Sequence, residues 1–334
     1  MKITNKSREP EMRRVHGPKG RMKLGVSVLA VSTMFAGSAC GAGAQTVNGE
    51  RVAHTGPAAK AFTPADLSKE LRGLETSYQG RIGAFAIDTG TGRTVGYRTH
   101  ERVPSNSTFK AILCGAVLHK ARTTDPGLLN RTLHWTKEEV VDGSGITGKE
   151  ENIRNGMTVA RLCEATITTS DNTAANVLLK QVVGGPRGMT RHYRSLGDPV
   201  GRLDAYEPEL NHWNPGEKHD TVMPAFMARD LQKLTVGTAL APQDRQQLAT
   251  WMKATTTGDE RIRAGVPKGW TVGDKTGTAD GWYAAANDIA IAWPPSGAPV
   301  IIAVYTHRDA KDAKFDNKVI AQTTTALMRA LGKA

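Results

Sequence analysis

A serine and a lysine three residues apart stand at the expected start of a helix, in the stretch Ser107-Thr108-Phe109-Lys110. This spacing places both side chains on one face of the first helical turn. A serine hydroxyl becomes a nucleophile when a neighbouring group takes its proton, and a lysine amine can do so if burial or nearby cations lower its pKa. Backbone N–H groups at the helix start could stabilise an oxyanion. The pair therefore indicates acyl transfer, although Ser-x-x-Lys also occurs by chance.

Two further short motifs carry polar side chains, Ser170-Asp171-Asn172 and Lys275-Thr276-Gly277-Thr278. The first lies between two expected helices, where Asp or Ser could simply cap the helix that starts at Asn172. The second ends an expected strand, where a lysine often serves only to discourage edge-to-edge pairing. Each motif by itself therefore has an ordinary structural interpretation.

The segment 205–220 reads AYEPELNHWNPGEKHD and is predicted to be a loop. Pro208 and Pro215 each remove a backbone donor and disfavour helix in the residue before them. The loop carries Glu207 and Asn211. On its own, such a loop is most simply a solvated surface connection.

Hydrophobic periodicity predicts the elements that position these side chains. Helices are expected over 64–78, 109–119, 159–167, 172–183, 225–234, 242–252 and 313–331. Strands are expected over 82–88, 94–97, 270–275, 284–293 and 300–306. The order predicts an α/β fold: an antiparallel β-sheet of about five strands, flanked by N- and C-terminal helices, with an all-α subdomain inserted between strands. Residues 62–103 and 253–334 would form the sheet subdomain and 104–252 the helical one, with the active site in the cleft between them.

The N-terminal residues 1–44 are predicted to be a signal peptide. Eight Lys and Arg residues precede an apolar run from 24 to about 36, which is too short to span a bilayer, and Ala42-Gly43-Ala44 offers a cleavage site. Residues 45–61 are small and polar, as in a linker. The protein is therefore expected to be exported, to the periplasm or outside the cell.

The export route has alternatives. Arg13-Arg14 ahead of the apolar run would suit twin-arginine export, but Met22 could be the true start and would remove the pair. Cys40 raises lipoprotein anchoring, which is less favoured because Gly37, Ser38 and Ala39 precede it instead of a large aliphatic residue.

Charge and cysteine usage exclude several function classes. The formal net charge is +12, and half of that excess belongs to the predicted leader; the other basic residues are scattered, so nucleic-acid binding is not expected. After the leader only Cys114 and Cys163 remain, and an exported pair suits a disulfide better than a metal site, although buried free thiols are the alternative. The nine histidines show no close pairing at helical ligand spacing, so neither a metal nor a cofactor is expected.

Taken together and in this order, the three motifs resemble the active-site set of penicillin-interacting serine enzymes. The likeness extends between the motifs, and over about residues 60–334 the chain is similar to a class A β-lactamase. The stretches that carry this resemblance are STFKAILCGAVL, GMTVARLCEATITTSDNTAANVLL, EPELN, TTGDERIRAGVPKGWTVGDKTGT and NDIAIAWPP.

The resemblance gives the 205–220 loop a function. In this family a glutamate followed by proline, with an asparagine four residues on, holds the water that frees the acyl-enzyme, and Glu207, Pro208 and Asn211 match these positions. Transpeptidases and β-lactam sensor domains share the serine, lysine and Lys-Thr-Gly elements but stay acylated. A cell-wall D-Ala-D-Ala peptidase and a slowly deacylating sensor are therefore the alternatives to a β-lactam hydrolase.

The resemblance implies two sets of functional residues. The catalytic set comprises a nucleophile and three groups that move protons: Ser107, Lys110, Ser170 and Glu207. Whether Lys110 or Glu207, acting through a water, is the acylation base stays open. The substrate-binding set holds the carboxylate and the amide of a small-molecule β-lactam: Asn172, Asn211, Arg261, Lys275, Thr276, Gly277 and Thr278. The backbone N–H groups of Ser107 and Thr278 would form the oxyanion hole. We expect a monomer without membrane insertion.

The chain departs from the family pattern at four places. Arg261 stands where some members supply a carboxylate-binding arginine, because the more common position for it holds Ala286. The arginine that often pairs with the aspartate near the end of the loop is replaced by Ala205, although Asp220 is present. Gly143 stands where an aromatic often gates the cleft, and the stretch 278–286 resembles an insertion. These departures put the substrate range in doubt and leave the chemistry unchanged.

Overall fold

The computed structural model describes residues 62–334, which all belong to one compact unit, Ala59–Ala334. The predicted signal peptide (1–44) and linker (45–61) lie outside the described residues, as do Arg13-Arg14 and Cys40. Within residues 62–334 no helix combines the length and the apolar character that crossing a membrane requires.

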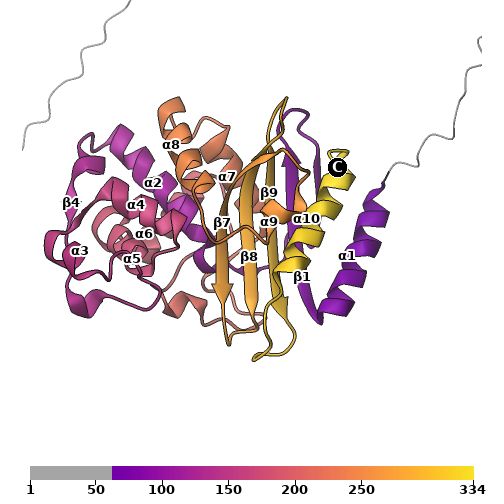
Figure 1. The fold of residues 1–334 in the computed structure, drawn as a ribbon, viewed down its shortest axis with the longest axis horizontal. Coiled ribbons are helices and arrows are strands. Elements are labelled where there is room, and N and C mark those ends of the chain that lie inside the picture. Colours follow the sequence, from indigo (N-terminus) through magenta and orange to yellow (C-terminus); the bar gives the residue numbers. More distant parts are fainter. Residues whose placement is uncertain (1–61) are drawn as a thin grey trace, which may run out of the picture. The chain divides into compact units, whose positions relative to one another are not determined.

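A five-stranded antiparallel sheet forms the centre of the fold, as predicted (Figure 1). Its spatial order is β2 (Thr94–Tyr97), β1 (Gly80–Asp88), β9 (Val300–Arg308), β8 (Ala285–Trp293) and β7 (Thr271–Ala279). The inner strands β8 and β9 are apolar and buried over almost their whole length, which is typical of strands covered on both faces. Alternate residues of β9 therefore enter two separate cores: Ile302 and Val304 one, Ile301 and Ala303 the other.

Two helices from the ends of the described chain, α1 (Pro64–Tyr78) and α10 (Asn317–Leu331), cover one face of the sheet (Figure 1). Helix α1 begins where the sequence predicts, because Thr63 and Asp66 form a capping box around Pro64. Leu67 and Leu71 pack with Leu327 and with the sheet. The short helix α9 (Ile262–Gly265) lies against α10.

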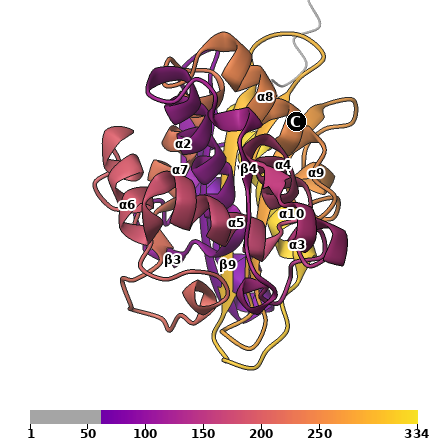
Figure 2. The same cartoon turned by 90° about the vertical axis from the view of Figure 1, so that its left-hand side faces the viewer.

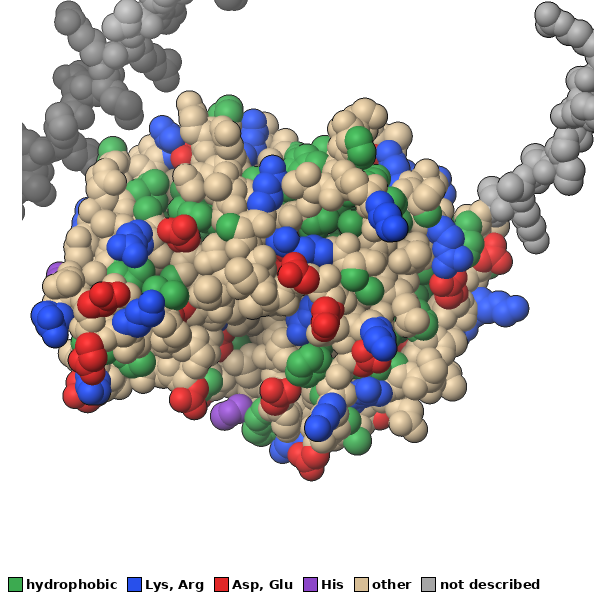
Figure 3. All heavy atoms as spheres, in the orientation of Figure 1, with side chains coloured by type: hydrophobic (Ala, Val, Ile, Leu, Met, Phe, Trp, Pro, Cys, Tyr) green, Lys and Arg blue, Asp and Glu red, His purple; other side chains and the backbone are tan. Residues whose placement is uncertain are grey.

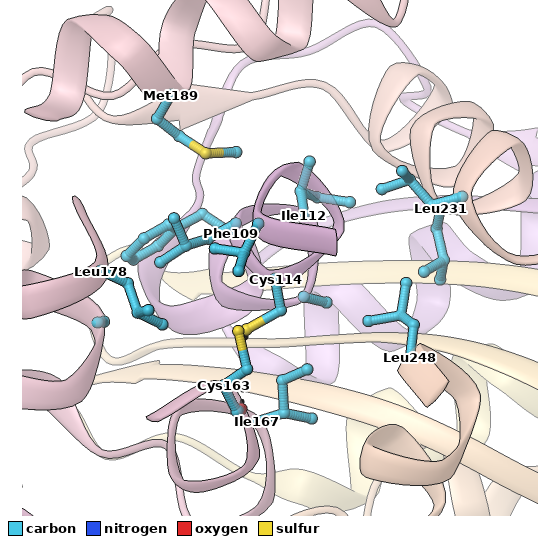
Figure 4. Close-up of a cluster of buried hydrophobic side chains, with 14 of the residues drawn as sticks. Phe109, Ile112, Cys114, Cys163, Ile167, Leu178, Met189, Leu231 and Leu248 are labelled. Carbon is cyan, nitrogen blue, oxygen red and sulfur yellow. Dashed lines mark hydrogen bonds between the residues drawn. The ribbon is translucent and has the colours of Figure 1, made fainter. Parts of the chain in front are cut away.

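The opposite face of the sheet carries α7 (Pro224–Thr235) and the helical part of the molecule (Figure 2). The central helix there is α2 (Phe109–Thr123), which is buried from Phe109 to Leu118 because nearly every side chain on that stretch is apolar or small. Side chains from α4 (Val159–Thr168), α5 (Asn172–Leu178), α6 (Gly185–Ser195), α7 and α8 (Pro242–Lys253) point toward it (Figure 4). The helical part also includes the short helix α3 (Glu150–Asn155).

Several predicted boundaries are wrong. Strand β7 does not end at Lys275, as predicted, but runs through the Lys-Thr-Gly motif to Ala279, paired with β8 throughout. The last helix starts at Asn317 and not near 313, because the Asp316 side chain accepts the N–H of Lys318 and caps it there. Helix α5 gives way after Leu178 to a π-helical turn over Leu179–Val183. Helices α3, α6 and α9 were not predicted. The division into two subdomains stays a prediction.

The predicted disulfide is absent from this structure. Cys114 of α2 and Cys163 of α4 lie side by side as buried free thiols (Figure 4). The Cys114 thiol donates to the carbonyl oxygen of Cys163, at an Sγ–O distance of 3.7 Å. Burial raises the pKa of the Cys114 thiol well above its usual value, which disfavours the reactive thiolate. The two cysteines thus act as apolar packing residues here.

Candidate active site

The serine and lysine of the first motif converge on one carboxylate. Ser107 lies in a single 3-10 turn, Asn106–Thr108, that leads directly into α2. Its Oγ donates to Glu207 Oε1 at 2.9 Å, and Lys110 Nζ lies 2.9 Å from the same oxygen. Lys110 and Glu207 are almost completely buried, at 0% and 1% exposed. The predicted common face of Ser107 and Lys110 is therefore confirmed, with Glu207 facing it.

Lys110 is also held by the second motif. Its Nζ donates to the Ser170 carbonyl oxygen at 2.8 Å and to Asn172 Oδ1 at 2.5 Å. Burial lowers the pKa of Lys110, and the neighbouring Glu207 opposes that shift. An ammonium with a lowered pKa can give up its proton and then accept one.

The Ser170-Asp171-Asn172 motif caps a helix and also lines a cavity. Asp171 is the N-cap of α5 and accepts the N–H of Ala174 at 2.9 Å. Ser170, just before it, has a left-handed backbone with φ of 61°. Its Oγ lies 3.0 Å from Lys275 Nζ and 3.4 Å from Lys110 Nζ. The cap thus holds the turn that presents the Ser170 hydroxyl to two ammonium groups.

Lys275 lies on the edge strand β7, but it does not face solvent. Its side chain is fully buried, and Nζ also donates to the Thr276 carbonyl oxygen at 2.8 Å. Burial, with Lys110 nearby, lowers the pKa of Lys275 to about 7. The interpretation that this lysine only protects the sheet edge is therefore wrong.

Gly277 allows β7 to approach the nucleophile. A Cβ at this position would lie 3.0 Å from Asn106 Cβ and 3.1 Å from the backbone nitrogen of Ser107. Those distances are tighter than ordinary contacts, so a side chain here would push the strand away from Ser107.

Glu207 lies in the loop over residues 203–220, which includes the predicted loop 205–220. Hydrogen bonds hold both the backbone and the side chain of Glu207. Asn176 on α5 accepts the Glu207 N–H at 3.0 Å and donates to the Glu207 carbonyl oxygen at 2.8 Å. Asn211 Nδ2 donates to Glu207 Oε2 at 2.7 Å, and the Glu207-Pro208 peptide bond is cis. The interpretation of this glutamate as a solvated surface charge is wrong. Sequence analysis missed Asn176, although its position four residues after Asn172 places both on one face of α5.

A chain of asparagine side chains joins the loop to the sheet, and no local sequence motif predicts it. Asn287 on β8 donates to Asn106 Oδ1 at 2.7 Å, and Asn106 donates to Asn211 Oδ1 at 2.9 Å. The chain fixes the orientation of Asn211, so that its amide nitrogen faces Glu207.

Arg261 is buried, with only 4% of its surface exposed, so it is not a surface arginine. Its guanidinium donates to Thr278 Oγ1 at 2.7 Å, to the Gly277 carbonyl oxygen at 3.0 Å and to the Asn287 carbonyl oxygen at 2.7 Å. Arg261 therefore supplies a positive charge next to the Lys-Thr-Gly strand. The position that often holds this charge, Ala286, is a buried alanine on β8.

Most of the motif residues line one cavity of about 280 Å³, and Lys110 and Lys275 lie buried behind its wall. Its wall is formed by Ser107, Gly143, Thr169, Ser170, Asn172, Glu207, Asn211, Thr257, Arg261, Thr276, Gly277 and Thr278. A larger cavity of about 610 Å³, beside α9 and α10, is lined by none of the motif residues. Figure 3 shows one face of the molecule, hollowed near its centre, on which basic and acidic side chains are mixed and not separated by sign.

Two departures from the family pattern have structural explanations. Gly143 has φ of 77°, and a Cβ there would lie 2.7 Å from Asn172 Nδ2, so only glycine fits beside Asn172 in this conformation. The Asn172 amide also donates to the Asp142 carbonyl oxygen at 2.7 Å. At the neck of the loop, Asp220 accepts the N–H of Asp204 at 2.7 Å and that of Ala205 at 3.1 Å. Backbone N–H groups thus pair with the Asp220 carboxylate, in place of the arginine that many family members have there.

Comparison with known proteins identifies relatives over most of the chain. The model of the β-lactamase enzyme family matches residues 66–331. The β-lactamase AST-1 of Nocardia asteroides is 43% identical, over 93% of this chain and 96% of its own length. The crystal structure of a β-lactamase from Streptosporangium roseum is 59% identical with a TM-score of 0.78, covering 81% of this chain and 100% of that one.

A class A β-lactamase of the last common ancestor of Gram-negative bacteria has 48% identity and a TM-score of 0.75, covering 79% of this chain and 99% of that structure. Its fold, like that of the Streptosporangium enzyme, therefore extends over the sheet and the helices that build the cavity. Together with the family match, these relatives show that the chain belongs to the class A serine β-lactamase family.

Proposed function

We propose that this protein hydrolyses β-lactam antibiotics through a serine acyl-enzyme. The observation that carries the proposal is the position of Glu207, whose carboxylate touches both Ser107 and Lys110 on one oxygen and Asn211 on the other. A serine with an adjacent base supports acylation, and a carboxylate next to an amide supports activation of a water.

Acylation begins at the Ser107 hydroxyl, which attacks the β-lactam carbonyl carbon. Its proton passes to Glu207 Oε1, with which it already forms a hydrogen bond, or to Lys110 once that amine is neutral. The backbone N–H groups of Ser107 and Thr278 bind the developing oxyanion; the close approach of Gly277 to Ser107 supports this role. Ser170, between the two lysines, passes a proton to the ring nitrogen as the C–N bond breaks.

Deacylation uses the other side of the cavity. Glu207 takes a proton from a water while Asn211 fixes the position of both, and the hydroxide attacks the ester carbonyl carbon. The Ser107 oxygen then leaves and regains its proton. The bond from Asn211 to Glu207 Oε2 leaves Oε1 free to change partners during this step.

Substrate binding relies on positive charge at the end of β7. Lys275, Thr276, Thr278 and Arg261 would hold the carboxylate that these substrates carry, since Arg261 and Thr278 already share a hydrogen bond. Asn172 would bond the side-chain amide of the substrate. No metal or cofactor takes part in this scheme.

The setting of the enzyme follows the same proposal. We infer export through a cleaved signal peptide and action as a monomer on a small molecule, without nucleic acid or membrane insertion. The D-Ala-D-Ala peptidase and sensor alternatives receive no support from the relatives, which are named as β-lactamases.

The decisive experiment follows one turnover of a chromogenic cephalosporin by stopped flow, with intact-protein mass measured in parallel. We expect wild type to turn over repeatedly. Glu207→Gln should release product roughly 10²–10⁴-fold more slowly and accumulate a covalent adduct, because a general base is lost while Lys110 can still accept the Ser107 proton.

A matched control is Glu209→Gln, two residues further on, where the side chain is exposed. This variant should behave as wild type. Equal turnover by Glu207→Gln and wild type would remove Glu207 from the mechanism, and a wild-type protein that is acylated once and releases nothing would favour the sensor or the peptidase.

A further inference from the structure

The active half of the 203–220 loop is covered by an aromatic stack. His212 directly follows Asn211, and its ring lies on the ring of Trp282 with a centroid distance of 4.6 Å and an interplanar angle of 28°. Lys311 Nζ lies 4.0 Å from the centroid of the Trp282 ring. Trp282 therefore connects three segments that are far apart in the sequence: the loop, the β7–β8 connection and the segment after β9.

The β7–β8 connection presents Trp282 rigidly. The Tyr283 N–H donates to the Lys311 carbonyl oxygen at 2.9 Å, and Arg308 N–H donates to the Tyr283 carbonyl oxygen at 2.6 Å. Tyr283 and Ala284 have left-handed backbones, with φ of 56° and 45°. Two consecutive non-glycine residues in that region persist only where their surroundings hold them. This connection includes the stretch that the sequence marks as insertion-like.

A second set of aromatic contacts also joins the loop to the β7–β8 connection. Trp213, only 2% exposed, packs its ring edge-on against Tyr283 at 6.4 Å and against His307 at 5.2 Å between centroids. Offset and edge-on aromatic pairs stabilise beyond the area they bury. Two consecutive loop residues, His212 and Trp213, are thus docked on the β7–β8 connection.

These contacts matter because the neck of the loop lacks the arginine brace. The Asp220 carboxylate accepts the N–H groups of residues 204 and 205 and contacts His219, and the Asp220 N–H donates to Asp204 Oδ2. These bonds hold residues 204 and 205 and do not involve Glu207 or Asn211. The half of the loop that carries Glu207 and Asn211 is fixed by Asn176, by Asn106 and by the aromatic stack one residue beyond Asn211.

We propose that Trp282, through its stack on His212, is a positioning residue for deacylation: it holds Asn211 and Glu207 where they can activate the hydrolytic water. The inference rests on the proposed function and adds a residue to it. Trp282 does not line the cavity, so it acts through the loop and not by touching the substrate. Loss of the stack should consequently slow hydrolysis of the acyl-enzyme more than its formation, because Lys110 can still accept the Ser107 proton when Glu207 is displaced.

The test compares Trp282→Ala, Trp282→Phe and His212→Ala by single-turnover stopped flow with a chromogenic cephalosporin, which separates acylation from deacylation. We expect Trp282→Ala to slow deacylation about tenfold, since small misplacements of catalytic groups are costly, and to change acylation less than twofold. Trp282→Phe keeps a ring for His212 and should recover most of the rate. Combining His212→Ala with Trp282→Ala should add little to either variant alone.

A matched control is available on α7. Phe226 on α7 pairs edge-on with His100 at 6.1 Å, another histidine–aromatic contact, and neither residue lines the cavity. Phe226→Ala should leave both rates unchanged.

The outcomes separate this inference from the proposed function. Wild-type turnover with an unaltered deacylation rate in Trp282→Ala would overturn the positioning role alone, as would equal slowing of both steps or a Trp282→Phe variant as slow as Trp282→Ala. A wild-type protein without turnover would instead overturn the proposed function.

Discussion

The two walls of the active-site cavity are built in different ways. One wall consists of regular elements: α2 carries Lys110, the start of α5 follows Ser170, and β7 carries Lys275 in a ladder with β8. The other wall is the 203–220 loop, whose only regular element is a single 3-10 turn, Glu209–Asn211. Backbone hydrogen bonds fix the first wall, whereas side chains of asparagines and aromatics fix the second. The groups that we propose for acylation are therefore set by the regular elements, and those proposed for deacylation by a few separate contacts.

Charge is divided between the walls in the same way. The regular wall supplies the cations Lys110 and Lys275, and the loop supplies the anion Glu207, all of them nearly fully buried. Burying an ion is costly unless it is paired and hydrogen-bonded. The cations therefore stabilise the observed position of the loop, while the loop carboxylate partly offsets the effect of burial on the pKa of Lys110.

The largest expected effect concerns the free energy of unfolding and compares two buried aspartates, Asp171 beside the regular wall and Asp220 at the neck of the loop. Asp171 accepts hydrogen bonds from the N–H groups of Ile146, Thr147 and Ala174, and from the Thr147 hydroxyl. Its replacement in Asp171→Ala should lower the free energy of unfolding by about 4 kcal/mol, because several buried donors lose a charged acceptor. Urea denaturation measures this change.

Asp220→Ala is the matched variant on the loop. Asp220 accepts two backbone N–H groups, and burial raises the pKa of its carboxyl group, so its removal also relieves a cost of burial. We expect a loss of only about 2 kcal/mol. Equal losses for the two variants, or a larger one for Asp220→Ala, would contradict the idea that the regular wall is the more firmly fixed.

A smaller effect is expected for substrate binding on the regular wall. Arg261→Ala removes a guanidinium that contacts Thr278 and should raise KM for carboxylate-bearing β-lactams about tenfold, a loss of about 1.4 kcal/mol, with little change in kcat. Arg329→Ala, which removes an arginine paired with Glu70 on the surface, is the control. If both variants keep the wild-type KM, Arg261 has only a structural role.

The inner strands of the sheet and the first helix were the parts that the sequence predicted best. The apolar runs of β8 and β9 and the capped start of α1 are local signals, and they gave nearly the observed boundaries. Helix α6, with the sequence GPRGMTRHYRS, was not predicted. Its eleven residues include three Gly and Pro residues, which disfavour a helix, and only two large apolar residues, Met189 and Tyr193. Its stability comes from packing Met189 and Tyr193 into the core.

The residues of the site also differ in how well the sequence predicts them. Ser107, Lys110, Ser170 and Lys275 stand in short motifs that a single sequence reveals, and the structure brings them together with Glu207. Residues that orient these groups could not be predicted in the same way. The bond from Asn106 to Asn211 spans 105 positions, and that from Asn287 to Asn106 spans 181. The free thiols of Cys114 and Cys163 likewise depend on the packing of α2 against α4.

The smallest expected effect concerns the charge of Lys275 on the regular wall, which should change with pH. Burial lowers the pKa of Lys275 to about 7, so the amine is a cation below that value and largely neutral above it. A substrate carboxylate binds the cation, and KM should therefore rise a few fold, on the order of threefold, between pH 6 and pH 8.5. Steady-state kinetics across this range measure the change, with kcat followed separately.

Lys275→Arg provides the control, because a guanidinium keeps its charge throughout this range. Its KM should be independent of pH, even if the longer side chain raises the value itself. A rise with pH that persists in Lys275→Arg would assign the titration to another group on the same wall, with Lys110 as the nearest candidate because burial lowers its pKa too. In that case the cation that titrates would lie beside the nucleophile Ser107, and not where the substrate carboxylate binds.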